Sequence, residues 1–205
     1  MRIAIFGGTF DPVHSAHLAL AGEAVRAFGL ERVLFVPASR PPHKSGATVA
    51  GYEDRYRMVE LACQGEPEFE PSRLEEGQER SYSIDTIERV RGGQAPGDEL
   101  FFLIGADAFA EIATWRRWQD VVGAVRFIVA ARPGHDYAVP PGAAVERLDT
   151  MALAVSSSSI RARLAAGENP PELPTSVLAY IRERGLYGFS CSGGRGSSGS
   201  DSLSP

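Results

Sequence analysis

The 205-residue chain is predicted to fold as a doubly wound α/β domain, with a mostly parallel sheet and helices on both of its faces. Two observations predict this fold. First, apolar runs of strand length alternate with longer runs of helical periodicity along most of the chain. Second, a buried run at residues 2–6 ends in two glycines, a helical run then ends at Gly29, and a second buried run follows at residues 32–36. Strand, helix and strand at this spacing form a βαβ unit, which requires parallel strands and a right-handed crossover.

The other elements continue this alternation. Strands are expected at residues 2–6, 32–36, 69–74, 100–104, 125–130 and 145–148. Helices are expected at residues 17–28, 54–63, 83–90, 108–118, 157–166 and 175–184. Gly29 suits a left-handed helix C-cap, and Ser83 suits a helix N-cap. Residues 1–187 are therefore expected to form one domain, and the Gly- and Ser-rich residues 188–205 are expected to form a disordered tail.

Composition and charge narrow the class of protein. The net charge of −5, from 21 basic and 26 acidic residues, argues against a nucleic-acid partner, because such binding depends on many Lys and Arg side chains. No apolar run reaches the ~20 residues that a membrane span needs, and no signal segment is seen. Cys63 and Cys191 belong to no CxxC or Cys/His cluster, which favours free thiols. We expect a cytoplasmic protein without a nucleic-acid or membrane partner, and whether it forms a homo-oligomer stays open.

Ligands of doubly wound sheets bind outside the carboxyl ends of the strands, and three polar segments are expected there. They are residues 7–10, residues 37–44 and residues 105–107. In the first, Gly7-Gly8-Thr9-Phe10 lets the backbone approach a nucleotide, and its turn N–H groups can bind phosphate oxygens. The segment matches neither the GxGxxG nor the GxxxxGK[ST] pattern, and a plain tight turn is the alternative.

Two histidines and a lysine follow these strand ends. His14 and His17 lie three residues apart near the start of a predicted helix, so both rings share one face beside a helix end that favours anions. The alternatives are a helix-capping pair and a metal site, although no further metal ligands stand at a useful spacing. Lys44 follows two prolines, which could hold its side chain over the strand ends; an exposed lysine is the alternative.

A run of serines that favours a helix start is followed closely by an arginine, which the start of a helix disfavours. Ser156, Ser157 and Ser158 are natural N-caps, whereas Arg161 is placed in the first helical turn, where the helix dipole disfavours a cation. A phosphate bound by helix N–H groups, hydroxyls and the guanidinium would resolve this conflict. The alternative is a surface arginine that tolerates a small energetic cost.

Aromatic and acidic residues follow the strand predicted at residues 100–104. Trp115 and Trp118 are either two core rings or include one ring that stacks on a planar part of a substrate. Asp107 stands at the strand end, where an acidic side chain can accept hydrogen bonds from ribose hydroxyls.

Several of these motifs together resemble a known family. The segments from Gly8 to His17 and from Ser156 to Arg161 resemble the HxGH nucleotidyltransferase superfamily, which has a Rossmann-like fold. Further segments look like the bacterial nicotinate-nucleotide adenylyltransferases: Pro41-Pro42-His43-Lys44, Ser81-Tyr82-Ser83-Ile84-Asp85-Thr86, Phe102-Leu103-Ile104-Gly105-Ala106-Asp107, Thr114-Trp115 and the run from Tyr180 to Tyr187. The resemblance covers residues 2–187 and leaves the tail outside.

The resemblance implies transfer of AMP from ATP to nicotinate mononucleotide, giving deamido-NAD and pyrophosphate, with Mg²⁺ carried by ATP and no protein metal site. It also implies three sets of site residues. The catalytic, phosphate-holding set is His14, His17, Lys44 and Arg161. The other ATP-binding residues are Gly8, Thr9, Phe10, Gly105, Asp107, Arg132, Ser156, Ser157 and Ser158. The nicotinate mononucleotide pocket is Ser83, Thr86 and Trp115, with the indole stacked on the pyridine.

Three positions depart from the family's pattern. Ala16 stands where Gly is usual and adds a methyl group close to the nucleotide, so we expect a tight but working site. Ser83 and Ser158 replace threonines and keep the hydroxyl group. The alternative functions are transfer to nicotinamide mononucleotide or to pantetheine phosphate, and a non-catalytic nucleotide-binding module. The sequence does not rank nicotinate against nicotinamide.

Overall fold

The computed structural model describes residues 1–40, 49–151 and 155–189. Its centre is a six-stranded sheet in the order β3-β2-β1-β4-β5-β6, with every neighbouring pair parallel. The strands are β1 (Arg2–Gly8), β2 (Arg32–Pro37), β3 (Phe69–Pro71), β4 (Glu99–Gly105), β5 (Arg126–Ala131) and β6 (Ala144–Asp149). The predicted doubly wound sheet is confirmed, and its strand order reverses between β1 and β4.

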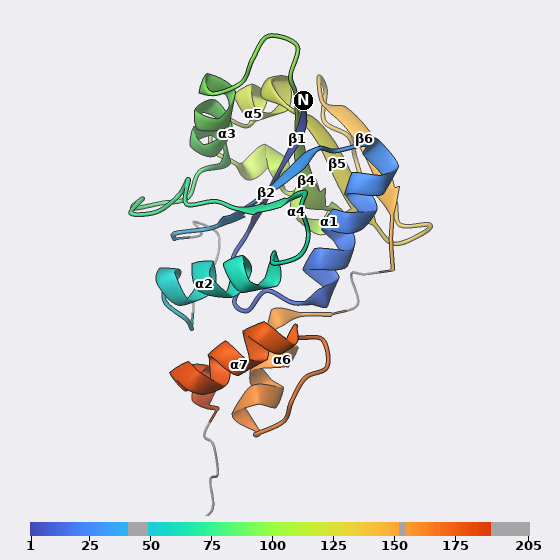
Figure 1. The fold of residues 1–205 in the computed structure, drawn as a ribbon. Helices are drawn as coiled ribbons and strands as arrows, with labels where there is room; N and C mark the ends of the chain where they lie inside the picture. Colours follow the sequence, from blue (N-terminus) through green and yellow to red (C-terminus); the bar gives the residue numbers. More distant parts are fainter. Residues whose placement is uncertain (41–48, 152–154, 190–205) are drawn as a thin grey trace, which may run out of the picture.

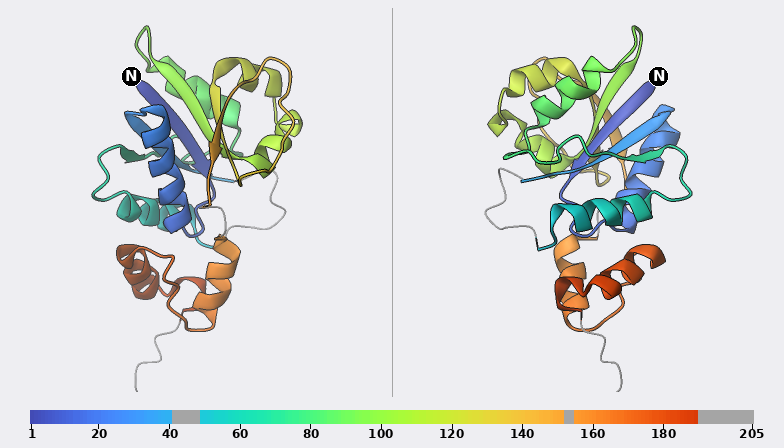
Figure 2. Two further views of the ribbon diagram at one scale, coloured as in Figure 1. Left: turned by 90° about the vertical axis from the view of Figure 1, so that its right-hand side faces the viewer. Right: turned by 60° about the vertical axis from the view of Figure 1, so that its left-hand side comes forward.

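Helices cover both faces of this sheet (Figures 1 and 2). One face carries α1 (Ser15–Phe28) and α2 (Tyr52–Ala62), and the apolar cluster under them continues into α6 (Ser157–Ala165) and α7 (Thr175–Arg184). The other face carries α3 (Ser83–Gly92), α4 (Ala106–Ala110), the 3-10 turn η1 (Ile112–Thr114) and α5 (Trp118–Ala124). Figure 1 shows α6 and α7 below α1 and α2, beyond the carboxyl ends of the strands, so they help to enclose that edge of the sheet.

The two faces of the sheet have separate apolar clusters because successive strand residues point to opposite sides. In β1, Ala4 and Phe6 pack with the cluster under α1 and α2, whereas Ile3 and Ile5 pack with the cluster under α3, α4 and α5. Both faces are therefore buried, which explains why the strands are continuous apolar runs rather than alternating ones.

The helix ends test two local predictions. Gly29 is the C-cap of α1 with φ 59° and ψ 42°, so the predicted left-handed cap is confirmed. The prediction that Ser83 caps α3 is wrong. Tyr82 occupies the N-cap position without a side-chain hydrogen bond, and Ser83 is the first helical residue.

The single helix predicted at residues 108–118 is also wrong. The chain leaves α4 at Ala110, makes the short turn η1, and starts α5 only after Arg117, which has a left-handed φ of 53°. Between them Trp115 is extended, and its ring packs edge to face on Phe102 of β4 at 5.9 Å between centroids. This packing of Trp115 on the sheet overrides the helical propensity of the segment.

The folded chain continues two residues past the predicted domain boundary. The 3-10 turn η3 (Leu186–Gly188) is followed by Phe189, which is buried beneath the Arg182 guanidinium at 5.5 Å. Gly188 and Phe189 therefore belong to the domain, and residues 190–205 of the predicted tail lie outside the described residues.

Two further observations concern predictions about cysteines and membranes. Cys63 is a free, buried cysteine, and burial raises its thiol pKa to about 12, while Cys191 lies outside the described residues. Within the described ranges, no helix combines the length and the apolar character that a membrane crossing requires.

Candidate active site

Three pockets lie along the carboxyl edge of the sheet, where the sequence places its polar motifs. We call the first the tryptophan pocket; it has a volume of about 260 Å³, and its walls include Gly7, Gly8, Thr9, Tyr82, Ser83 and Trp115. The second, the histidine pocket, has about 190 Å³ and includes His14, Ala16, His17, Ser156 and Ser157. The third, the Arg132 pocket, has about 300 Å³ and includes Gly105, Asp107, Arg132 and His135.

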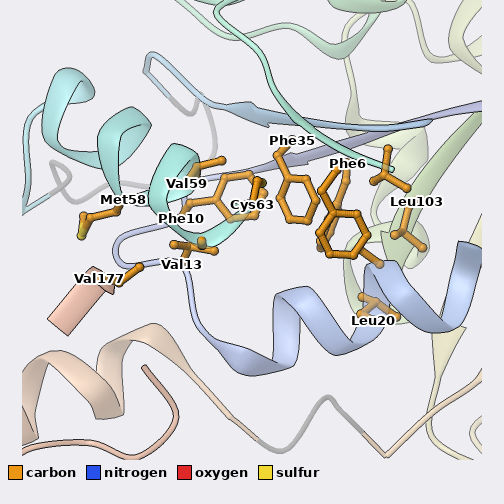
Figure 3. Packing of buried hydrophobic residues seen from close by; sticks show 14 of the residues in the cluster. Phe6, Phe10, Val13, Leu20, Phe35, Met58, Val59, Cys63, Leu103 and Val177 are labelled. Atoms are coloured by element: carbon orange, nitrogen blue, oxygen red, sulfur yellow. The ribbon is translucent and has the colours of Figure 1, made fainter. Parts of the chain in front are cut away.

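The loop after β1 is shaped by Phe10, which does not line any of these pockets. Its ring is 2% exposed and packs against Phe6 and Phe35 at 5.5 and 5.7 Å between centroids (Figure 3). A Cβ at Gly8 would approach this ring to 2.9 Å, which explains the glycine there. The Phe10 ring therefore lies outside the three pockets, so the expected contact with ATP falls to its backbone. The ring instead supports the edge of His17 at 5.1 Å.

The two histidines meet as predicted on one face at the start of α1. Their rings stack with centroids 3.8 Å apart and an interplanar angle of 28°. His14 is the N-cap residue, and its backbone N–H donates to Nδ1 of His17 at 3.2 Å, so the pair also caps the helix. A neutral His17 that accepts at Nδ1 carries its proton on Nε2, the nitrogen that can then donate to an anion.

Burial changes the charge of His14. The residue is 3% exposed, its Nδ1 has no hydrogen-bond partner in the described part of the chain, and burial lowers its pKa to about 4, against a smaller opposing effect of Glu172. At neutral pH the ring is therefore uncharged. It can offer an N–H group to a phosphate, and positive charge must come from other side chains.

This shift predicts how the stability of the protein depends on pH. Because the folded pKa of His14 is about 4 against an ordinary value of 6.5, the unfolded chain binds a proton in this window that the folded chain does not. The free energy of unfolding should fall as the pH decreases from 6.5 to 4, with His14 contributing about 3 kcal/mol of that loss. Urea unfolding at several pH values should show a shallower loss in His14→Gln than in the unmodified protein.

The exposed His135 supplies a control for this measurement. His135→Gln should keep the full pH dependence, since this side chain is exposed on the turn after β5. Equal slopes for His14→Gln and the unmodified protein would contradict the assignment.

The start of α6 is attached to the loop after β1. The Ser157 hydroxyl donates to the carbonyl of Pro12 at 3.0 Å, and the Arg161 guanidinium donates to the carbonyl of Asp11 at 2.7 Å. Ser156 is the N-cap and accepts from the Ser159 N–H at 3.2 Å, as predicted. These contacts bring Ser156 and Ser157 into one pocket with the two histidines.

Two details of this serine segment differ from expectation. Arg161 is the fifth residue of α6, just past the first turn in which it was expected, so the unfavourable helix-dipole effect is weaker than the sequence suggested. Ser158 is exposed and lines none of the three pockets. Ala16 is 9% exposed and lines the histidine pocket, so its methyl group does lie where the family pattern has none.

The Arg132 pocket joins three residues that were expected near adenosine. Gly105 and Asp107 follow β4, and Arg132 follows the neighbouring strand β5. His135, which the sequence analysis missed, also lines this pocket with Nε2 4.0 Å from Oδ1 of Asp107. Its position just past a strand end is the signal that could have found it.

The expected nicotinate residues divide into two groups. Ser83 and Trp115 line the tryptophan pocket together. Thr86 does not; it is buried, and its hydroxyl donates to Oε1 of Glu75 at 2.7 Å. One helical turn separates Ser83 from Thr86, but the hydroxyl of Thr86 is held inside the protein by Glu75. Other residues of this pocket that sequence reasoning missed are Glu75, Tyr82, Glu111 and Arg116.

A buried arginine supports this edge of the sheet. Arg55 of α2 is 1% exposed and donates to the carbonyls of Thr9, Ser39 and Ala50 at 2.8, 3.4 and 3.3 Å. Lys44 itself, with Pro41, Pro42 and His43, lies outside the described residues. In the described ranges, no group of three or more His, Cys, Asp or Glu side chains is arranged to hold a metal ion.

Comparison with known proteins shows which family the chain resembles. The family model described as Cytidylyltransferase-like matches residues 5–163. A "Probable nicotinate-nucleotide adenylyltransferase" of Solibacter usitatus is 62% identical over 187 residues, covering 91% of this chain and 100% of that protein. The protein of the same description from Thermus thermophilus is 41% identical, with 91% of this chain and 100% of that protein covered.

Solved structures agree on the fold. Nicotinic acid mononucleotide adenylyltransferase of Plasmodium falciparum, complexed with NaAD, has a TM-score of 0.76 at 19% identity and covers 92% of this chain and 98% of its own. A Vibrio parahaemolyticus structure described as a nicotinate-nucleotide adenylyltransferase has a TM-score of 0.64 at 20% identity, with 91% and 94% covered. With the 62% identity to the Solibacter protein over its whole length, the chain belongs to the nicotinate-nucleotide adenylyltransferase family.

Proposed function

We propose that this chain transfers the AMP part of ATP to the phosphate of nicotinate mononucleotide, giving deamido-NAD and pyrophosphate in NAD biosynthesis. The observation that carries the proposal is the division of the carboxyl edge into three pockets of different chemistry. An indole wall suits a pyridine ring, imidazoles and hydroxyls suit phosphates, and a carboxylate beside an arginine suits a nucleoside. The family of the chain joins these three parts in one reaction.

The proposed reaction needs no protein nucleophile, because the phosphate of the mononucleotide can attack the α-phosphorus of ATP directly. The protein must align the attacking oxygen with the leaving pyrophosphate, and such positioning contributes about 7–11 kcal/mol to lowering a barrier. The tryptophan pocket would hold the acceptor and the Arg132 pocket the adenosine. The histidine pocket would hold the phosphates of ATP.

Charge develops on the leaving pyrophosphate, and donors aimed at it lower the barrier. His17 would donate from Nε2, and His14, which is neutral at pH 7, would donate an N–H group without adding charge. Arg161 would supply positive charge together with Lys44, and binding of a phosphate would compete with the carbonyl of Asp11 for the guanidinium. Ser156 and Ser157 would add hydroxyl groups at the start of α6.

Mg²⁺ is proposed to enter with ATP, where it neutralises part of the phosphate charge. The described walls of the histidine pocket present imidazoles and hydroxyls and no carboxylate. Mg²⁺ prefers oxygen ligands and keeps several waters, so this wall fits an ion held by phosphates and water.

The proposal is tested by measuring pyrophosphate release from ATP with each acceptor in turn. Nicotinate mononucleotide should support turnover and yield deamido-NAD. Turnover with pantetheine phosphate alone would assign another transferase activity, and binding of ATP without turnover on any acceptor would assign a nucleotide-binding module.

Trp115→Ala should raise the KM for nicotinate mononucleotide about 10-fold and leave the KM for ATP nearly unchanged, because stacking of a ring on an aromatic side chain contributes about 1–3 kcal/mol. Steady-state kinetics with each substrate varied would measure both constants. Trp118→Ala is the matched control, since Trp118 packs on the same apolar cluster without lining the tryptophan pocket. An unchanged KM for the mononucleotide would make Trp115 a core residue only.

A further inference from the structure

The tryptophan pocket contains charged side chains that the family pattern does not explain. Glu75, Glu111 and Arg116 line it together with Trp115, so Arg116 is the only cation among its described walls. One oxygen of the Glu75 carboxylate already accepts from Thr86, and Glu111 is exposed. Two carboxylates around a pocket disfavour an anionic substrate unless a cation offsets them.

Arg116 is an exposed residue whose guanidinium lies over a ring of the pocket wall. Its guanidinium lies 4.6 Å from the centroid of the Tyr82 ring, and in the described part of the chain it has no hydrogen bond or ion pair. Stacking over an aromatic ring fixes the plane of the guanidinium and leaves its N–H groups available. Tyr82 also lines the pocket, so the guanidinium is held at the pocket wall.

The next residue shows the contrast. Arg117 is paired with Glu88 at 2.9 Å and with Asp120 at 2.7 Å, and it does not line the tryptophan pocket. Arg117 is therefore neutralised by carboxylates of α3 and α5, whereas Arg116 lines the pocket without such a partner among the described residues.

The acid form of the mononucleotide carries a negative charge on its ring substituent, whereas the amide form carries none there. Both pyridine rings stack equally well on Trp115, and an oxygen of the carboxylate or of the amide can accept a hydrogen bond from the Ser83 hydroxyl. Only the acid carries a carboxylate, which an arginine binds with two parallel, charge-assisted N–H···O bonds. An amide cannot accept both bonds and leaves the cation uncompensated.

We propose that Arg116, held over Tyr82, binds the ring carboxylate of the acceptor and so selects nicotinate over nicotinamide mononucleotide. This inference rests on the proposed transferase function. It assigns the acid-versus-amide choice, which the sequence did not settle, to one side chain of the pocket.

The test compares kcat/KM for the two mononucleotides in the full-length enzyme. Arg116→Gln should lower the ratio of kcat/KM for the acid to kcat/KM for the amide at least tenfold, with the KM for ATP unchanged. Arg116→Lys, which keeps the charge without the planar fork, should retain part of the preference. Arg117→Gln removes the same charge from the neighbouring residue and should leave the ratio unchanged.

The outcomes separate this inference from the proposed function. If the unmodified enzyme forms deamido-NAD and Arg116→Gln keeps a ratio within twofold of it, the role of Arg116 is overturned while the function stands. If the unmodified enzyme forms no dinucleotide, the function is overturned. Calorimetric binding of each mononucleotide to the two proteins still tests Arg116 in that case, and an equal loss for both ligands would overturn its role.

Discussion

His17→Ala is expected to lower kcat by roughly 10²–10³-fold, the usual cost of removing one donor that faces developing charge. The ring lines the histidine pocket, where the pyrophosphate would leave, and the hydrogen bond from His14 leaves its proton on Nε2. The tryptophan pocket is formed by other residues, so the KM for nicotinate mononucleotide should change little. Initial rates at saturating ATP, with the mononucleotide varied, would separate the two effects.

A second variant controls for lost packing at this position. His17 also packs against the edges of Phe6 and Phe10, at 6.0 and 5.1 Å between centroids, so alanine removes packing as well as a donor. His17→Gln keeps much of the volume and places an amide N–H₂ near the former Nε2, and it should recover part of the lost turnover. Near-normal kcat in His17→Ala would show that the ring does not act on the reaction.

The fold was predictable because its signals are local and repeated. Buried strands such as residues 2–6 and 32–36 are continuous apolar runs, and Gly29 marks a helix end by a conformation that few other residues adopt easily. The rule that parallel strands end at one edge then groups residues that are distant in sequence. It placed residues 7–10 and 105–107 at one edge of the sheet, where they line neighbouring pockets, whereas Arg132 was expected there only from the family resemblance.

The directions of individual side chains were not predictable in the same way. Phe10 belongs to the motif that is expected to contact the nucleotide, yet its ring turns into the core because the loop places this residue at a positive φ of 49°. Thr86 lies one turn from Ser83, but it pairs with Glu75, a residue with no periodic signal. Both outcomes depend on the tertiary partner, which a single sequence does not reveal.

The burial of individual arginines was the feature that the sequence predicted least well. Arg55 and Arg57 stand two residues apart in the helix predicted at residues 54–63, and no pattern in the sequence distinguishes them. In the folded chain one is buried and the other pairs with Glu60 at the surface. The same holds for Arg116 and Arg117, where only one of two identical neighbours faces a pocket. Whether an arginine is buried depends on its partners in the folded chain, so the spacing of residues in the sequence does not predict it.

Arg55→Ala should be the most destabilising single substitution on α2, with a loss of about 3–5 kcal/mol of unfolding free energy. Burial lowers the pKa of Arg55, against an opposing effect of the nearby Asp11 carboxylate, and the guanidinium satisfies the carbonyls of Thr9, Ser39 and Ala50. Removing it would leave buried acceptors unpaired beside a buried carboxylate, each at a cost of about 1–3 kcal/mol. Urea denaturation would measure the loss.

The matched control is Arg57→Ala on the same helix, an exposed pair with Glu60, which should cost less than about 1 kcal/mol. Arg55→Lys keeps the charge but cannot reach three carbonyls at once, so its stability should fall between those of the alanine variant and the unmodified protein. Because Thr9 and Ser39 follow the ends of β1 and β2, Arg55→Lys should also raise the KM for ATP, an effect that Arg57→Ala should not show. Equal stability losses for the two alanine variants would mean that the network around Arg55 contributes little to the fold. A KM for ATP unchanged in Arg55→Lys would mean that it supports the fold without shaping the site.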